Sequence, residues 1–442
     1  MSAHLDPVAP DVEESSSGSH FSSPDRPTWD LYSVCIHCGL CLNHCPTYRV
    51  LGMEADSPRG RIYQVLQVDS GRLPIGESFV THIDRCLDCR ACETACPSGV
   101  EYGRIVERAR AEIELHYRRP WFERRLRQWF FRRLLPDYER LARTAAWLRF
   151  FQRSGLEAFL RHSGLLKLCG VADVAALAPR IADDFFFREM GRTYLAAGEH
   201  RASVMFLAGC VASVAFAELN RATIRVLQAN GVEVFVPLEQ SCCGALATHA
   251  GFREEARALA RRNLEAFQGG EHDFILTNAA GCGATLKEYE DLLASDDDEA
   301  REARAFAARV RDVTEFLAEL GLRPPRRKVP CRVTYQDPCH LAHAQRIRSA
   351  PRQLLEAIGA ELVEMPHSDH CCGSAGIYNV VETELSMQIL DARMEDVAST
   401  SAEVIATANV GCMLQLRAGV RRRGLGMEVK HVVELLDEAY GD

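Results

Sequence analysis

Two identical cysteine runs between residues 35 and 97 constrain this chain more than any other feature of its sequence. Each run has the spacing C-x2-C-x2-C-x3-C-P, and the eight cysteines are Cys35, Cys38, Cys41, Cys45, Cys86, Cys89, Cys92 and Cys96. Three closely spaced thiolates can approach three different iron atoms at one corner of an iron–sulfur cube. The sequence therefore predicts that these thiolates hold two [4Fe–4S] clusters.

The fourth cysteine of each run is expected to ligate the cluster of the other run. This crossing is typical of two-cluster bacterial ferredoxins, whose cysteine spacing both runs match. The prediction is one cluster on Cys35, Cys38, Cys41 and Cys96, and a second on Cys86, Cys89, Cys92 and Cys45. Structural zinc and disulfides are the alternatives, but zinc usually takes two separated cysteine pairs and disulfides are rare in reducing compartments.

Composition indicates a globular, multidomain protein. The chain has 442 residues, of which 47% are hydrophobic and 26% charged, and its net charge of −9 gives no reason to expect a nucleic acid partner. A chain of this length typically forms about three domains. No apolar stretch is long enough to span a bilayer, and the N-terminus lacks the basic and apolar segments of a signal peptide. We therefore expect a cytoplasmic protein whose cysteines stay reduced and serve as ligands.

The N-terminal quarter is expected to divide into a tail and a cluster-binding domain. Residues 1–28 are rich in Ser, Asp, Glu and Pro, which predicts a disordered tail, and residues 29–106 are expected to form a helical, two-cluster, ferredoxin-like domain. Between the cysteine runs, Arg59 and Arg61 lie at the start of an expected helix. They could stabilise the more negative, reduced clusters, or they could be a solvated helix start, and the sequence leaves both interpretations open.

Residues 107–200 are expected to form a basic, helical connector, which Pro136 divides. Ten arginines and only three acidic residues lie between Arg118 and Arg149, together with three of the four tryptophans. Arginines opposite Trp and Phe are typical of helices on a membrane surface, so residues 118–151 could make peripheral contact with a membrane. The alternative is that the same apolar stripe packs on a partner subunit or on the core of this chain.

Residues 201–325 and 326–442 are expected to be two copies of one α/β unit. Corresponding cysteines of the pattern C…CCG…GC lie 129 or 130 residues apart, which indicates an internal repeat. The cysteines follow apolar segments that are expected to be strands, namely 203–208, 232–237, 274–277, 332–335, 361–365 and 403–407. Open α/β sheets place ligands beyond the carboxyl ends of their strands. The fold class expected for the chain is therefore α+β and multidomain, with a helical two-cluster domain followed by two α/β repeats.

The two copies contribute eight further cysteines, which are Cys210, Cys242, Cys243, Cys282, Cys339, Cys371, Cys372 and Cys412. They could hold a further iron–sulfur cluster, because thiols that converge at strand ends suggest ligation, or they could be small buried core residues. Cys169 and Cys331 lie outside both patterns and are expected to be structural. Four histidines flank the cysteines of the second copy: His340, His343, His367 and His370. They could relay protons, neighbour a cluster, or have neither role.

The repeat pattern resembles the cysteine-rich CCG domain of heterodisulfide reductases and related iron–sulfur oxidoreductase subunits. In that family the full motif ends in C-x-x-C and can hold an unusual iron–sulfur cluster. Here the residue three positions before Cys282 is Ala279, and the residue three positions before Cys412 is Asn409. Each copy therefore lacks one thiolate of the full motif. An ordinary [4Fe–4S] cluster, a site shared between the copies, and an empty site remain as alternatives.

The motifs together are similar to those of glycolate oxidase iron–sulfur subunits, over nearly the whole chain beyond the tail. Besides the cysteine runs, the resemblance rests on segments 58–63, 242–244, 281–284, 343–345, 371–376 and 407–412. It implies an electron-transfer subunit that receives electrons from a flavoprotein subunit, which carries FAD and oxidises glycolate to glyoxylate. The electrons would pass through the clusters towards a quinone pool or another membrane acceptor.

The sequence independently supports this division of labour. It contains no G-x-G-x-x-G after an expected strand, no Walker loop and no nucleophile elbow. A hydride-accepting cofactor is therefore expected on another subunit, while one-electron clusters here divide the flavin's electron pair. No catalytic residue is assigned to this chain. The alternatives are a thiol–disulfide oxidoreductase of the heterodisulfide reductase type and a metal-stabilised scaffold without redox function.

Overall fold

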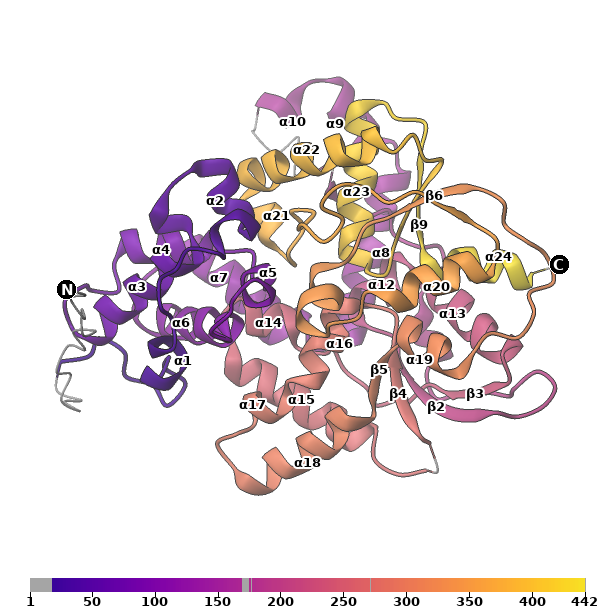
Figure 1. Ribbon diagram of the computed structural model, residues 1–442, viewed down its shortest axis with the longest axis horizontal. Helices are drawn as coiled ribbons and strands as arrows, with labels where there is room; N and C mark the ends of the chain where they lie inside the picture. Colours follow the sequence, from indigo (N-terminus) through magenta and orange to yellow (C-terminus); the bar gives the residue numbers. More distant parts are fainter. Residues whose placement is uncertain (1–17, 169–174, 176, 271, 442) are drawn as a thin grey trace, which may run out of the picture.

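The computed structural model describes residues 18–168, 175, 177–270 and 272–441. A helical N-terminal part, a helical linker and two α/β repeats follow one another along the chain. The two repeats, each with its own sheet, lie together on one side of the molecule, and the N-terminal part lies on the other (Figure 1). This is the expected α+β, multidomain fold. Among the described residues, no helix is both long and apolar enough to cross a membrane.

The N-terminal part, residues 18–116, is called the cluster domain below. Its helices are α1 (Trp29–Ser33), η1 (Leu42–His44), α2 (Pro46–Leu51), η2 (Glu54–Asp56), α3 (Pro58–Asp69), α4 (Glu77–Asp84), α5 (Ala91–Thr94) and α6 (Tyr102–His116). Ser57 caps α3 by accepting a hydrogen bond from the Gly60 amide, and Pro58 occupies the first turn, where no N–H donor is needed. Val65 of α3 and Ile113 of α6 are fully buried in one apolar core that extends to the cysteine runs.

Residues 18–28 differ from the disordered tail that the sequence predicts. Phe21 is only 2% exposed in the core of the cluster domain, and Asp25 forms an ion pair with Arg257 of the first repeat. A buried aromatic ring and a charge-assisted pair hold this short segment in place although its composition is polar. Residues 1–17, the rest of the expected tail, lie outside the described residues.

The linker is helical, as the sequence predicts. Its elements are α7 (Trp121–Trp129), the π-helical turn η3 (Phe130–Leu134), α8 (Tyr138–Arg153), α9 (Leu156–His162), α10 (Leu165–Leu168) and η4 (Phe186–Glu189). Helix α6 continues past the domain boundary expected at residue 106. Pro136 separates η3 from α8, because proline cannot donate the backbone hydrogen bond that a continuous helix needs. Cys169 lies outside the described residues.

The first repeat contains a five-stranded sheet in the order β1-β3-β2-β4-β5. Its strands are β1 (Thr193–Tyr194), β2 (Ala202–Leu207), β3 (Val232–Phe235), β4 (Phe274–Thr277) and β5 (Val310–Asp312). Strand β1 is antiparallel at one edge, and the other strands are parallel. Strand β2 lies in the middle because its apolar residues are buried on both faces, as is typical of parallel strands covered by helices.

The second repeat contains a parallel sheet in the order β7-β6-β8-β9. Its strands are β6 (Arg332–Tyr335), β7 (Glu361–Leu362), β8 (Val404–Thr407) and β9 (Glu428–His431). The order repeats that of β3-β2-β4-β5, which confirms two copies of one α/β unit. The sequence does not predict β5 and β9 because both are short and run directly into helices. Their last residues, Asp312 and His431, each form a capping box with the next helix.

Helices pack around both sheets and join their strands. In the first repeat they are α12 (Cys210–Ala215), α13 (Ala217–Ala229), α14 (Ala245–His249), α15 (Arg253–Ala266), α16 (Ala280–Lys287), α17 (Tyr289–Leu292), α18 (Asp297–Arg309) and α19 (Val313–Leu320). In the second they are η5 (His340–Ala344), α20 (Ser349–Ala357), α21 (Tyr378–Val381), α22 (Thr383–Ser399), α23 (Val410–Arg423) and α24 (Val432–Tyr440). The repeats meet where β4 and β8 end. At this junction the Ala280 amide donates to the Ala408 carbonyl oxygen at 3.4 Å. The cysteines that follow the strands are thereby gathered near this junction.

Candidate iron–sulfur centre

Both cysteine runs use the same uncommon backbone conformation. His37 and Asp88, the third residues of the two runs, have positive φ angles of 54° and 51°. Gly39 and Arg90, which follow the second cysteine of each run, have φ angles of 84° and 58°. Left-handed residues turn the chain sharply and are uncommon outside glycine. Each run has one such residue on either side of its second cysteine. The two turns bend the run so that its cysteines face a common centre.

Four cysteines line one cavity in the cluster domain. They are Cys45, Cys86, Cys89 and Cys92. The cavity therefore brings the fourth cysteine of the first run together with the first three of the second, which is the grouping that crossing ligation requires. Arg61 and Tyr102 form part of its walls. Four convergent thiols fit a [4Fe–4S] cluster, which takes four thiolates.

The other four cysteines of the runs gather nearer the surface. Cys35 lies beside Cys96 and Cys38: burial raises the pKa of the Cys35 thiol, and the charges of these two neighbours raise it further. Burial likewise raises the pKa of Cys41 to about 11, and Cys35 is among the neighbours that raise it. Cys96 of the second run thus lies with the first run. Cys38 is exposed, so this second thiol set reaches the molecular surface.

The two arginines expected beside the clusters have different environments. Arg61 is 1% exposed and donates to the His82 carbonyl oxygen at 2.6 Å and to the Thr47 hydroxyl at 3.1 Å. It lies in the wall of the cysteine-lined cavity and pairs with the buried Asp56 at 3.5 Å. Arg59 lies nearer the surface, pairs with Glu54 at 2.6 Å and also donates to the carbonyl oxygen of His37.

The first repeat brings its four cysteines together where its strands end. The sulfur atoms of Cys210 and Cys242 are 3.4 Å apart. Cys243 lies beside both Cys242 and Cys282, and hydrogen bonds from these two thiols hold the pKa of Cys243 well below its usual value. The linker covers the site, since Tyr138 is partly buried against the core that contains Cys210, Cys242 and Cys243.

The second repeat has the same arrangement. Cys371 lies beside Cys339 and Cys372, and Cys372 lies beside Cys412. Hydrogen bonds from Cys371 and Cys412 lower the pKa of Cys372 well below its usual value. Asn409, which stands where the full CCG motif has a further cysteine, donates its amide to the Cys412 sulfur at 3.4 Å. Convergent thiols of this kind are a donor set suited to iron.

The second cysteine run packs directly on the second repeat. The Cys89 thiol lies beside the Cys371 thiol, and this contact raises the pKa of Cys89. Cys89, Leu87 and Tyr378 belong to one apolar cluster that spans the two parts. No local signal in the sequence predicts this contact, because it joins residues that are far apart along the chain.

A buried ionic group, which sequence reasoning misses, joins the cluster domain to the first repeat. The Nδ1 atom of His249 lies 3.0 Å from carboxylate oxygens of both Asp88 and Glu107. Arg90 pairs with Glu288 and lies 3.4 Å from Glu107. Burial alone would lower the pKa of His249, but its hydrogen bonds to Asp88 and Glu107 raise this pKa to about 10, so His249 is an imidazolium at neutral pH. Asp88 within the second run is the one local hint.

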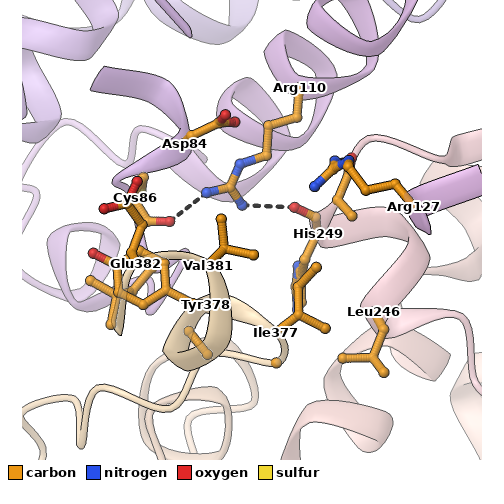
Figure 2. A pocket seen from close by; sticks show the side chains of 14 residues that line it. Asp84, Cys86, Arg110, Arg127, Leu246, His249, Ile377, Tyr378, Val381 and Glu382 are labelled. Atoms are coloured by element: carbon orange, nitrogen blue, oxygen red, sulfur yellow. Dashed lines mark hydrogen bonds between the residues drawn. The ribbon is translucent and has the colours of Figure 1, made fainter. Parts of the chain in front are cut away.

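All four parts of the molecule, the linker through Arg127 among them, meet at a pocket beside the second run (Figure 2). Arg110 of α6 spans the pocket and donates to the backbone carbonyl oxygens of Cys86 and, at 2.9 Å, His249. The Tyr378 hydroxyl of the second repeat donates to the Arg85 carbonyl oxygen at 3.1 Å. These bonds fix the backbone of the second run from both repeats, so the cavity lined by Cys86 is held in a defined shape.

The four histidines have separate roles. His340 is buried, its Nδ1 atom lies 3.5 Å from the Cys339 sulfur, and burial lowers its pKa to about 3, so the ring is neutral. Two others bind the cluster domain: His343 contacts the Thr94 hydroxyl at 2.9 Å, and His370 contacts Arg49 at 2.5 Å. His367 is exposed and stacks on His370. Of these four histidines, only His340 makes a hydrogen-bond contact with a cysteine of the repeats among the described residues.

Comparison with known proteins gives matches along most of the chain. Residues 32–100 match the 4Fe-4S dicluster domain, residues 204–287 and 333–417 match the cysteine-rich CCG domain, and residues 122–177 match the linker region of glycolate oxidase iron-sulfur subunits. The glycolate oxidase iron-sulfur subunit of Escherichia coli (strain K12) is 34% identical over 412 residues, which are 92% of this chain and 93% of that protein. The probable glycolate oxidase iron-sulfur subunit of Bacillus subtilis (strain 168) is 40% identical over 92% of this chain and 94% of its own length. The chain belongs to the family of glycolate oxidase iron–sulfur subunits.

A second group of relatives is similar over a shorter range. The lactate utilization protein A of Oceanobacillus iheyensis is 30% identical over 230 residues, which are 52% of this chain and 93% of that protein. Membership of the glycolate oxidase iron–sulfur subunit family makes the chain an oxidoreductase subunit. It carries two [4Fe–4S] clusters in its dicluster domain and two CCG domains behind a linker.

Proposed function

We propose that this chain conducts electrons from a flavin-bearing subunit that oxidises glycolate to glyoxylate. Oxidation of glycolate releases two electrons and two protons, and a flavin can accept them as a pair. Each [4Fe–4S] cluster, when bound, supplies a one-electron acceptor. The observation that carries the proposal is the succession of neighbouring thiol sets, from the set with the exposed Cys38, through the cavity lined by Cys89, to Cys371 of the second repeat.

The ligand sets follow from how the thiols are grouped. We assign Cys35, Cys38, Cys41 and Cys96 to the first cluster, and Cys86, Cys89, Cys92 and Cys45 to the second. The shared cavity of the second set and the position of Cys96 beside Cys35 support this crossing. The chain itself contributes the buried Arg61 and the rigid run backbones, which hold the thiols and favour the reduced state.

The repeats extend the path beyond the cluster domain. We propose that the four thiols of the second repeat hold the next redox group, because Cys371 lies beside Cys89. The four thiols of the first repeat form an equivalent set beneath the linker. One thiolate fewer than the full CCG motif favours an ordinary [4Fe–4S] cluster there, since such a cluster takes four thiolates.

The linker supplies a surface that suits a membrane acceptor such as a quinone pool. Trp121, Trp147 and Phe150 are 72%, 74% and 66% exposed, and exposed arginines such as Arg143 lie among them. Exposed aromatic rings beside arginines are the pattern of helices that rest on anionic membranes. We propose that this face rests on the cytoplasmic side of a membrane, where electrons leave the complex.

The test is iron and acid-labile sulfide content with EPR on the anaerobically purified chain. About twelve irons or more would show a further cluster in the repeats, whereas about eight would limit the chain to two clusters and leave the repeats with free thiols. Cys89→Ala should remove or convert the second cluster and stop glycolate-driven quinone reduction, while binding to the flavin-bearing subunit persists. Unchanged quinone reduction by Cys89→Ala would contradict the proposed path.

A further inference from the structure

The two cysteine runs are equivalent in sequence but not in their surroundings. Ile36 and Leu87 both follow the first cysteine of their run, and the backbone turns identically at the next residue. Leu87 is 4% exposed, whereas Ile36 is 68% exposed. Leu40 and Ala91, which precede the third cysteines, differ in the same way, at 58% and 2%. Among the residues that the structure describes, one run is therefore covered, and the same face of the other is exposed.

The cover of the second run is part of this chain. Leu385 and Ile389 of α22 and Tyr378 of α21 pack on Leu87 and Ala91 in one apolar cluster. At the same place Cys89 meets Cys371, so the covered face is also where the second cluster's ligand approaches the next thiol site. The second run thus packs on the second repeat through Leu87 and Ala91, the two apolar residues that lie between its cysteines.

The uncovered face of the first run is an apolar surface around an exposed ligand. What we call the first-run patch consists of Val34, Ile36 and Leu40 at the first run, and Met53, which precedes the Glu54 that pairs with Arg59; each is at least 44% exposed. Cys38 is also exposed. Arg59 holds the backbone of the first run in place, because its guanidinium donates to the His37 carbonyl oxygen at 3.2 Å. Exposed apolar residues gathered in this way on a rigid support are typical of protein interaction sites.

We propose that the first-run patch binds the flavin-bearing subunit and is where electrons reach this chain. This rests on the proposed function, which requires such a donor. The second run already contacts its redox neighbour inside the chain, so the first run is left for the external donor. Electron transfer slows steeply with distance, and a donor seated on the patch would lie against Cys38 itself. The aromatic face of the linker is a separate surface, formed by α7 and α8, and stays free for the acceptor.

The experiment compares three variants in the assembled complex. Ile36→Asp places a charge on the patch between two cysteines of the run, and Met53→Asp places one on the patch outside the run. If Ile36→Asp binds its cluster poorly, Met53→Asp still tests the patch. Leu195→Asp, at a residue that is also 68% exposed but directly follows strand β1 of the first repeat, is the matched control. Binding is measured by size-exclusion chromatography with the flavin-bearing subunit, and cluster reduction by EPR with glycolate or dithionite.

We expect both patch variants to weaken binding at least tenfold and to slow glycolate-driven cluster reduction equally, with dithionite-reducible clusters and iron content unchanged in Met53→Asp. Leu195→Asp should behave as the wild type.

Binding and reduction at wild-type rates in both patch variants would overturn the proposal. So would normal reduction by glycolate combined with loss of reoxidation by quinone, which would make the patch the acceptor site. Loss of self-association with normal reduction would make it a contact between copies. If the wild-type complex shows no glycolate-driven reduction at all, the proposed function fails, while the binding result still tests the patch.

Discussion

His249 shows how a single side chain can join two parts of this protein. It lies between the carboxylates of Asp88, inside a cysteine run, and Glu107 of α6. These three side chains are also close enough to one another to hold a metal ion. The nearby guanidinium of Arg90 and the charged imidazolium already balance the carboxylates, so an ionic contact between domains describes the group better.

Replacing His249 tests this contact through its pH dependence. Its pKa is raised from 6.5 to about 10 in the folded protein, so its stabilisation is complete below pH 6.5 and is lost as the pH rises through about 10. His249→Gln leaves Arg90 as the remaining cation beside the two buried carboxylates and should lower the free energy of unfolding by about 3 kcal/mol at neutral pH. Anaerobic thermal unfolding should show the difference in stability between His249→Gln and the wild type disappearing near pH 10. A gap that does not change with pH would contradict the ionic role.

Gly60 is required for a close approach of two backbone segments. A Cβ atom at this position would lie 1.9 Å from the carbonyl oxygen of Glu54, and backbone cannot move aside as a flexible side chain can. We expect Gly60→Ala to destabilise the cluster domain by about 2 kcal/mol and to lower cluster occupancy. Gly426→Ala, where nothing lies within 4 Å, is the control. Equal melting temperatures and iron contents for the two variants would show that the first turn of α3 adapts.

At the scale of the elements, the linker combines a buried and an exposed face. Phe131 and Leu135 pack on the first repeat, whereas Trp147 and Phe150 of α8 pack edge to face in solvent, with ring centroids 6.2 Å apart. The sequence predicts the helices and their apolar stripe, but it leaves open whether the stripe is core or surface. The structure shows that both occur on one linker, since α7 and α8 have more apolar residues than the repeat can cover.

The exposed face should bind anionic vesicles. The double variant Trp147→Glu, Phe150→Glu removes two exposed rings and adds repulsion, so we expect its partitioning onto phosphatidylglycerol vesicles to fall at least tenfold in a sedimentation assay. Leu238→Glu, an exposed residue of the first repeat, should bind as the wild type does. Wild-type binding should also weaken with salt, because arginines contribute to it. Equal partitioning of the double variant and the control would exclude this face.

At the scale of the molecule, two copies of one fold have different neighbours. The thiols of the second repeat meet Cys89 of the cluster domain, and the thiols of the first repeat lie beneath Tyr138 of the linker. Equivalent substitutions should therefore have unequal effects. We expect Cys371→Ser to slow transfer from the second cluster at least tenfold more than Cys242→Ser, as measured by freeze-quench EPR after glycolate addition. Equal slowing by both variants would mean that electrons pass through the two repeats alike.

Regular spacing explains which features the sequence predicts. The thiol crossing between Cys45 and the second run, and the two α/β copies, both follow from repeated motifs. The contact of Cys89 with Cys371, the burial of Phe21 and the pair of Asp88 with His249 do not follow, because they join segments that only the packed tertiary structure brings together. A polar composition at residues 18–28 even favours the wrong prediction.

The cover over the second run also sets an order for maturation of the protein. Residues 378–389, which pack on Leu87 and Ala91, are synthesised after the whole cluster domain. We therefore expect iron and sulfide for the second cluster to arrive before the C-terminal repeat docks, whereas the first run stays accessible until the flavin-bearing subunit binds. After oxidative damage, the first cluster could be rebuilt in place, but replacing the second would require the repeat to open.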